Sequence, residues 1–136
     1  MKKSLLLFTF ISILMISCTS EKGEVPVPVQ SCVTDSTVDI VNVTIGDNFF
    51  SPKDITIISG DTVKWLYTTG SSVHTTTCDG TNNTTLPTGA AAWDSGILNP
   101  GGTYKIAISV TGSYTYICTV HGIMMSGTIV VKPRCQ

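Results

Sequence analysis

The chain has 136 residues, enough for one small domain and a short N-terminal segment. Its eight basic and nine acidic side chains give a formal net charge of −1, and lysine and arginine form no cluster. Nucleic-acid binding depends on basic side chains that neutralise phosphate, so the composition argues against a nucleic-acid partner.

The first 17 residues have the pattern of an export signal. Met1-Lys-Lys precedes an apolar run over residues 4–16, which is followed by a serine and a cysteine. This run is shorter than the about 20 apolar residues that a membrane-spanning helix needs. We therefore predict a signal peptide at residues 1–17. Its removal would leave six basic and nine acidic side chains, a net charge of −3.

The cysteine that ends this segment suggests a lipid anchor. Met15-Ile-Ser-Cys18 resembles the end of a bacterial lipoprotein signal, which implies that Cys18 becomes the lipidated first residue. An ordinary secretory signal with an incidental cysteine is the alternative. In residues 18–37, Val25-Pro-Val-Pro-Val29 favours an extended tether rising about 3.1 Å per residue. We expect a protein of the bacterial cell envelope, anchored to a membrane in the periplasm or at the cell surface.

From residue 38 to 136 the sequence predicts one all-β domain. Glycine, proline, asparagine and aspartate separate short β-rich runs, and no convincing helical period occurs. The main runs are residues 38–45, 48–52, 54–58, 62–67, 73–77, 103–110, 114–118 and 128–132. Seven or eight short strands in a chain of this size are typical of a β-sandwich or barrel.

The run over residues 114–118 ends in a cysteine that the strand pattern directs inward. Side chains alternate between the two faces of a strand, so Tyr114, Tyr116 and Cys118 share one face. Two aromatic neighbours on that face place the Cys118 thiol toward an apolar interior.

Further metal-ligand side chains follow Cys118. The β pattern stops there, and we expect residues 119–125 to form a loop that folds His121 and a methionine back toward the thiol. The other histidine, His74, begins its β-rich run after a Gly-Ser-Ser turn and is expected at the same end of the domain. A thiolate, two imidazoles and a weak axial thioether are the ligands of a blue copper site, whereas structural zinc prefers four Cys or His ligands. We predict one copper ion that cycles between Cu(I) and Cu(II).

The three remaining cysteines are an odd number. Export permits a disulfide. Cys32 precedes the first strand and Cys135 follows the last, so we predict a Cys32–Cys135 bond, with Cys78 free or buried. Such a bond would destabilise the unfolded chain by about 4–5 kcal/mol on the chain-entropy model.

Several short motifs extend the pattern over residues 38–132. In chain order they are Phe50-Ser-Pro52, Ile55-Thr-Ile57, Gly60-Asp-Thr-Val-Lys-Trp65, Val73-His74, Trp93-Asp-Ser-Gly96, Pro100-Gly-Gly-Thr-Tyr104, residues 112–121 and Met125-Ser-Gly-Thr-Ile129. Together they resemble the cupredoxins, specifically the small plastocyanin-like and amicyanin-like type 1 (blue) copper proteins. The resemblance implies a Greek-key β-sandwich with copper at one end, and His74, Cys118 and His121 as equatorial ligands.

The resemblance also bears on the axial ligand and on the residues beside the ligands. In the family, the axial methionine is followed by one residue, a glycine and a β-branched strand. Met125-Ser-Gly fits this frame, while Met124 would match the shortest ligand loops and is the alternative. The family pattern further implies that the hydroxyls of Thr75 and Thr119 tie the two ligand loops together.

These features predict an electron carrier, not an enzyme. We expect a monomer that meets a redox donor and a redox acceptor transiently, with the loop residue His121 as the exposed edge. Gly122, Ile123 and Met124 would form an apolar docking patch, since redox encounters use small, transient interfaces. The alternative function is a copper-binding or copper-delivery protein without a redox role. Such a protein would favour exposed, methionine-rich or paired-cysteine sites.

Overall fold

The computed structural model describes residues 36–135. The predicted signal peptide, Cys18, Cys32 and nearly all of the predicted tether lie outside this range. Residues 36–135 contain nine strands and no helix. The strands are β1 (Ile40–Gly46), β2 (Phe49–Ser51), β3 (Asp54–Ile58), β4 (Thr62–Tyr67), β5 (Thr77–Cys78), β6 (Trp93–Asp94), β7 (Thr103–Ala107), β8 (Gly112–Cys118) and β9 (Gly122–Lys132). Over the same residues, no helix is present that could span a membrane.

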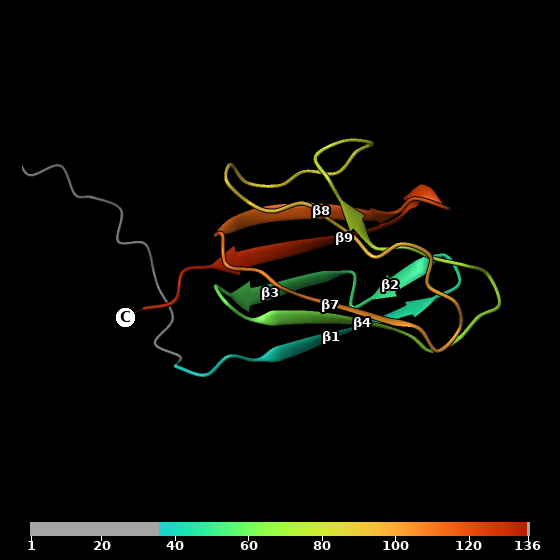
Figure 1. The fold of residues 1–136 in the computed structure, drawn as a ribbon, viewed down its shortest axis with the longest axis horizontal. Helices are drawn as coiled ribbons and strands as arrows, with labels where there is room; N and C mark the ends of the chain where they lie inside the picture. Colours follow the sequence, from blue (N-terminus) through green and yellow to red (C-terminus); the bar gives the residue numbers. More distant parts are fainter. Residues whose placement is uncertain (1–35, 136) are drawn as a thin grey trace, which may run out of the picture.

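The nine strands form two sheets that pack face to face (Figure 1). One sheet has the order β2-β1-β4-β7 and the other β3-β9-β8-β5-β6. The pairs β1/β4 and β3/β9 are parallel, and the other paired strands are antiparallel. This arrangement confirms the predicted all-β sandwich.

An aromatic cluster fills the space between the sheets. Alternate residues of β4 are buried, among them Trp65 and Tyr67, as expected for a strand with one face on the core. The Trp65 ring contacts the rings of Trp93, Tyr104 and Tyr116 at centroid distances of 5.9, 6.0 and 5.3 Å. Each such contact stabilises the fold by about 0.5–1.5 kcal/mol beyond the burial of apolar area. Through Tyr116, this aromatic cluster packs against β8, the strand that ends at Cys118.

The two ends of the sandwich differ in chemistry. The β1–β2 turn and the β8–β9 turn lie at one end, and the C-terminus lies at the other (Figure 1). At the C-terminal end, Asp61 accepts hydrogen bonds from Arg134 at 2.6 Å and from the Asp39 backbone N–H at 3.2 Å. This ion pair fixes the start of β4 against the end of the domain, and the predicted copper ligands lie at the opposite end.

Cys78, at the end of β5, is a free and buried thiol. Burial, and then the negative charge of Asp79, raise the pKa of Cys78 to about 11. The thiol donates to the Thr85 carbonyl at 3.2 Å. It therefore stays protonated at neutral pH, and a protonated, buried thiol is unreactive.

Cys135 is disulfide-bonded. Its predicted partner, Cys32, lies outside the described residues, so the pairing of these two cysteines stays a prediction.

Candidate metal centre

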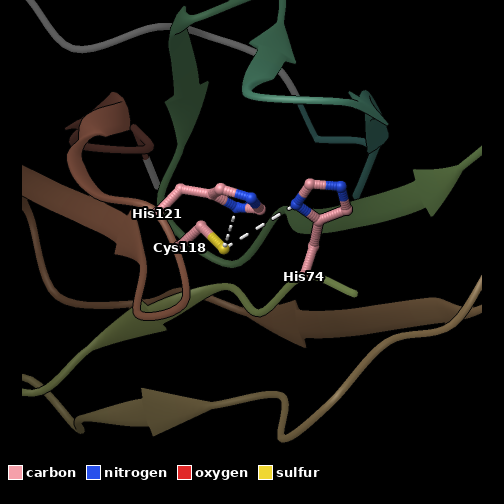
Figure 2. A group of neighbouring side chains, drawn as sticks. All are labelled: His74, Cys118 and His121. Atoms are coloured by element: carbon pink, nitrogen blue, oxygen red, sulfur yellow. Dashed lines mark hydrogen bonds between the residues drawn. The ribbon is translucent and has the colours of Figure 1, made fainter. Parts of the chain in front are cut away.

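Three side chains that are far apart in the sequence converge at one end of the sandwich. The sulfur of Cys118 lies 3.8 Å from Nδ1 of His74 and 3.4 Å from Nδ1 of His121 (Figure 2). One ligand atom from each of the three residues lies within 4.8 Å of the other two. A single ion could therefore contact one sulfur and two imidazole nitrogens.

Cys118 is the last residue of β8 and is fully buried. The alternation of β8 turns its side chain into the sandwich, as the sequence predicted. The Thr75 backbone N–H donates to the Cys118 sulfur at 3.3 Å. A donor aimed at the sulfur stabilises negative charge on it, which suits a thiolate ligand.

His74 is held by its backbone and by its ring. Residues 73–77 were predicted as a strand, but His74 forms only an isolated bridge to Leu98, with backbone hydrogen bonds of 3.1 and 2.7 Å. The buried ring packs edge-on against Tyr67, with ring centroids 4.8 Å apart. Its Nδ1 faces Cys118, and its Nε2 lies 3.4 Å from Oδ1 of Asp47. Both ring nitrogens therefore have a polar neighbour.

Asp47 keeps its negative charge in this position. Partial burial acts to raise the pKa of its carboxyl. Hydrogen bonds from the Ser72 N–H, His74, the Ser71 N–H and Tyr67 outweigh burial and leave the pKa below its ordinary value. The carboxylate is therefore ionised at neutral pH.

Threonine hydroxyls join the two segments that carry the ligands. Oγ1 of Thr75 lies 3.0 Å from Oγ1 of Thr119 and accepts the Thr119 backbone N–H at 2.8 Å. Oγ1 of Thr77 lies 3.2 Å from Thr75 Oγ1 and 3.1 Å from Asp94 Oδ1. The structure thus brings Thr75 and Thr119 together beside His74 and Cys118.

The segment after Cys118 differs from the prediction. A loop over residues 119–125 was expected, but β9 already begins at Gly122, so only residues 119–121 lie between the strands. A register shift at the end of β8 pairs Cys118 with Gly122, and Gly122 adopts φ 62°, which suits a glycine at a tight turn. The prediction was wrong because this pairing depends on the β8–β9 register, which the local pattern does not show.

The two candidate axial methionines lie in opposite environments. Met125 is buried, with 1% of its surface exposed, whereas Met124 is 85% exposed. Adjacent residues of a strand point to opposite faces, so the early start of β9 directs one side chain inward and the other outward.

Two features of the site were missed from the sequence. Asp47 stands in Gly46-Asp-Asn48, which was interpreted only as a turn signal, and its contact with His74 spans 27 residues. Val120 is also exposed, beside the predicted docking patch of Gly122, Ile123 and Met124. An acidic residue at a turn is common, so only the folded arrangement distinguishes Asp47 from an ordinary turn residue.

Comparison with known proteins defines the class. Residues 38–132 match the model of the copper binding proteins of the plastocyanin/azurin family. The match covers more than half of the chain, so the protein belongs to this family. No curated protein sequence matched the chain significantly.

Solved structures that are similar to this chain include a pseudoazurin and several amicyanin variants. A pseudoazurin from Sinorhizobium is 25% identical, with a TM-score of 0.59, over 72% of this chain and 77% of its own. A proline-to-glycine variant of amicyanin, in its reduced Cu(I) form at pH 4, is 24% identical, with a TM-score of 0.57, over 74% and 86% of the two chains. A second amicyanin variant, also reduced, is 23% identical, with a TM-score of 0.58, over 77% and 95%. These likenesses agree with the sandwich fold and with the cupredoxin resemblance.

The donor set fits the metal that the family binds. A buried sulfur that accepts an N–H, two imidazole nitrogens beside it and the buried thioether of Met125, four residues after His121 in the sequence, match the soft ligands of a type 1 copper site. The protein is therefore a cupredoxin-like type 1 copper protein, whose cofactor is one copper ion and whose class transfers electrons.

Proposed function

We propose that this chain is a membrane-anchored blue copper protein that carries single electrons between a redox donor and a redox acceptor. The convergence of one buried thiol and two Nδ1 atoms at one end of a rigid sandwich supports the proposal most directly. In this proposal residues 38–136 are the copper domain, and the chain acts as a carrier rather than as an enzyme.

His74, Cys118 and His121 are the proposed equatorial ligands, and Met125 is the proposed axial ligand. The burial of Met125 supports this choice over Met124, whose exposed side chain would have to turn inward past its own strand. The ligand spacing is then Cys-x-x-His-x-x-x-Met.

A fixed ligand set suits electron transfer. A copper ion bound here supplies one-electron chemistry between Cu(I) and Cu(II). The chain contributes rigidity, since the Thr75–Thr119 contact joins the two ligand segments and the His74–Leu98 bridge anchors the first of them. Ligands that do not move between two oxidation states keep the reorganisation that accompanies electron transfer small.

His121 is the proposed point of electron exchange with the partners. Its side chain is partly exposed, while the other three proposed ligands, His74, Cys118 and Met125, are buried. Ile123 and Met124 are 60% and 85% exposed, and with Gly122 they form the proposed docking patch. An exposed apolar patch beside a partly exposed ligand supports a small, transient interface.

The N-terminal segment gives the proposed location. Residues 1–17 would be removed as a signal peptide, and lipidated Cys18 with the tether to residue 37 would hold a monomeric domain at a membrane of the bacterial cell envelope. Cys32 and Cys135 would form the disulfide that closes the domain. The composition of these segments supports the proposal.

Voltammetry and copper transfer together test the function. For the purified protein loaded with copper, we expect a reversible one-electron wave and slow loss of copper to an added chelator, because the site is enclosed. Fast release of copper without a reversible wave would reject electron transfer and favour copper delivery. Loss of membrane association in Cys18→Ser, with the wave unchanged, would test the anchor separately.

A further inference from the structure

The Asp47 carboxylate contacts the side of the His74 ring that faces away from Cys118. Oδ1 of Asp47 lies 3.4 Å from Nε2 of His74, while Nδ1 of the same ring lies 3.8 Å from the Cys118 sulfur. The ring is fully buried, and the carboxylate is 42% exposed. Asp47 therefore stands between a buried candidate ligand and solvent.

The position of the carboxylate is fixed by groups around it. The Tyr67 hydroxyl lies 3.2 Å from Oδ1 of Asp47 and 2.6 Å from the Ser72 carbonyl oxygen. The backbone N–H groups of Ser71 and Ser72 each donate to the carboxylate at 3.4 Å. The Tyr67 ring also packs on His74, so one side chain supports both the carboxylate and the imidazole.

The chain leaves space for this carboxylate at Gly70. A Cβ atom at this position would lie 2.2 Å from Oδ1 of Asp47, and the residue has φ 134°, which L side chains rarely adopt. A larger residue at position 70 would therefore displace the Asp47 carboxylate from this position and strain the backbone.

We propose that Asp47 is a positioning residue of the copper centre, which orients His74 and lowers the reduction potential of the site. This inference rests on the proposed function. The carboxylate accepts the Nε2–H of His74, and this hydrogen bond selects the tautomer whose Nδ1 is free to act as a ligand. Its negative charge also favours the oxidised site, which carries one more positive charge than the reduced site.

Three variants separate the charge of Asp47 from its hydrogen bond. Asp47→Asn removes the charge and keeps an oxygen acceptor, and Asp47→Ala removes both. Asp39→Asn is the matched control. Asp39 is an exposed residue directly before the first residue of β1, whereas Asp47 directly follows the last. Reduction potentials would be measured by voltammetry, and the His74 ring nitrogens would be observed by 15N NMR in the copper-free protein.

We expect Asp47→Asn to favour reduction by up to about tenfold in the equilibrium constant. For one electron, this corresponds to a rise in the reduction potential of up to about 59 mV. Asp39→Asn should leave the potential unchanged. Asp47→Ala should raise it too, and the His74 Nε2–H signal should broaden or disappear as the proton loses its acceptor.

Equal potentials for wild type, Asp47→Asn and Asp39→Asn, with an unchanged His74 signal in Asp47→Ala, would overturn the inference. A reversible wild-type wave would show that the proposed function survives that result. If Asp47→Asn does not bind copper, Tyr67→Phe decides, since it weakens the hold on the carboxylate while keeping the ring against His74. A raised potential in Tyr67→Phe supports the inference, and an unchanged potential rejects it.

Discussion

His74 and His121 present the same ring atom, Nδ1, to the Cys118 sulfur, but the surroundings of the two rings differ. The His74 ring is buried, has Asp47 on its far nitrogen and is fixed through the bridge to Leu98. The His121 ring is partly exposed and lies on a short turn. We infer a division of roles, in which His74 serves stability and redox tuning while His121 faces the partner.

The local structure explains this asymmetry. His74 lies on a segment that is bridged to Leu98, and its ring contacts Asp47 of the β1–β2 turn. His121 follows the last residue of β8, where only three residues separate the strands, and its backbone N–H donates to the Cys118 carbonyl at 3.2 Å. The His121 ring on this turn is partly exposed, whereas the His74 ring is fully buried.

Removal of each histidine ring in turn should give the largest difference between His74 and His121. His74→Gly and His121→Gly should both lose the blue absorption of the copper-loaded protein. Added imidazole should restore the absorption in His121→Gly, because that cavity opens to solvent, and should fail in His74→Gly. Titration with imidazole, followed by visible absorption, checks this. Equal restoration in both variants would mean that the two histidines are equally accessible, against the proposal.

A charge in the docking patch should slow electron exchange by roughly tenfold, since burying an unpaired charge in an interface costs at least about 1–3 kcal/mol. The test variant is Met124→Asp, with stopped-flow rates measured against a redox partner. Val130→Asp is the control, because Val130 is 38% exposed on the same strand but outside the patch. The copper spectrum should be unchanged in both variants. Equal rates for the two variants would exclude the patch as the docking surface.

Gly70→Ala should disturb the surroundings of His74 and leave those of His121 unchanged. We expect a loss of about 2–3 kcal/mol in the free energy of unfolding, because the new methyl group both strains the backbone and displaces Asp47. Gly89→Ala is a matched control, since Gly89 has φ 82° but a methyl group there would meet no atom of a non-adjacent residue within 4 Å. It should cost about 1 kcal/mol and leave the reduction potential unchanged. Chemical denaturation and voltammetry measure both effects, and equal losses with equal potentials would contradict the role given to Gly70.

Thr75→Val should show how strongly the two ligand segments are joined. The change leaves the Thr119 N–H without its acceptor, so we expect a loss of about 1–2 kcal/mol in the free energy of unfolding. Thr85→Val removes an exposed hydroxyl contact with Thr115 and should cost less than about 0.5 kcal/mol. Denaturant unfolding of both variants checks the difference. A smaller loss for Thr75→Val than for Thr85→Val would argue against a structural link.

Much of the fold followed from local patterns. Alternation identified β3 and β4 with the bounds that the structure has, and the strand ending at Cys118 was predicted with its inward face correct. The two-residue strands β5 and β6 were not predicted as such, because they exist through pairings such as Cys78 with Trp93 and Thr77 with Ile117. A strand of two residues is too short to show an alternation of apolar and polar side chains.

The same distinction applies to the metal centre. Cys118, His121 and the methionines are close in sequence, so their spacing carried a signal, and His74 is the other of the two histidines in the sequence. The contact of Asp47 with His74 joins two turns that only the folded sandwich brings together. The early start of β9 depends on a register shift at Cys118. The Asp47–His74 contact and the β8–β9 register were therefore the parts that the sequence did not show.

The visible and EPR spectra of the protein loaded with Cu(II) decide whether the three converging side chains form a blue copper site. A thiolate ligand between two imidazoles predicts an intense charge-transfer band near the red end of the visible range and a narrow copper hyperfine splitting. Both should be lost in Cys118→Ser, which keeps the size of the side chain and removes the sulfur. A pale complex with wide splitting in the wild type, or a spectrum unchanged in Cys118→Ser, would show that Cys118 does not bind the copper as proposed.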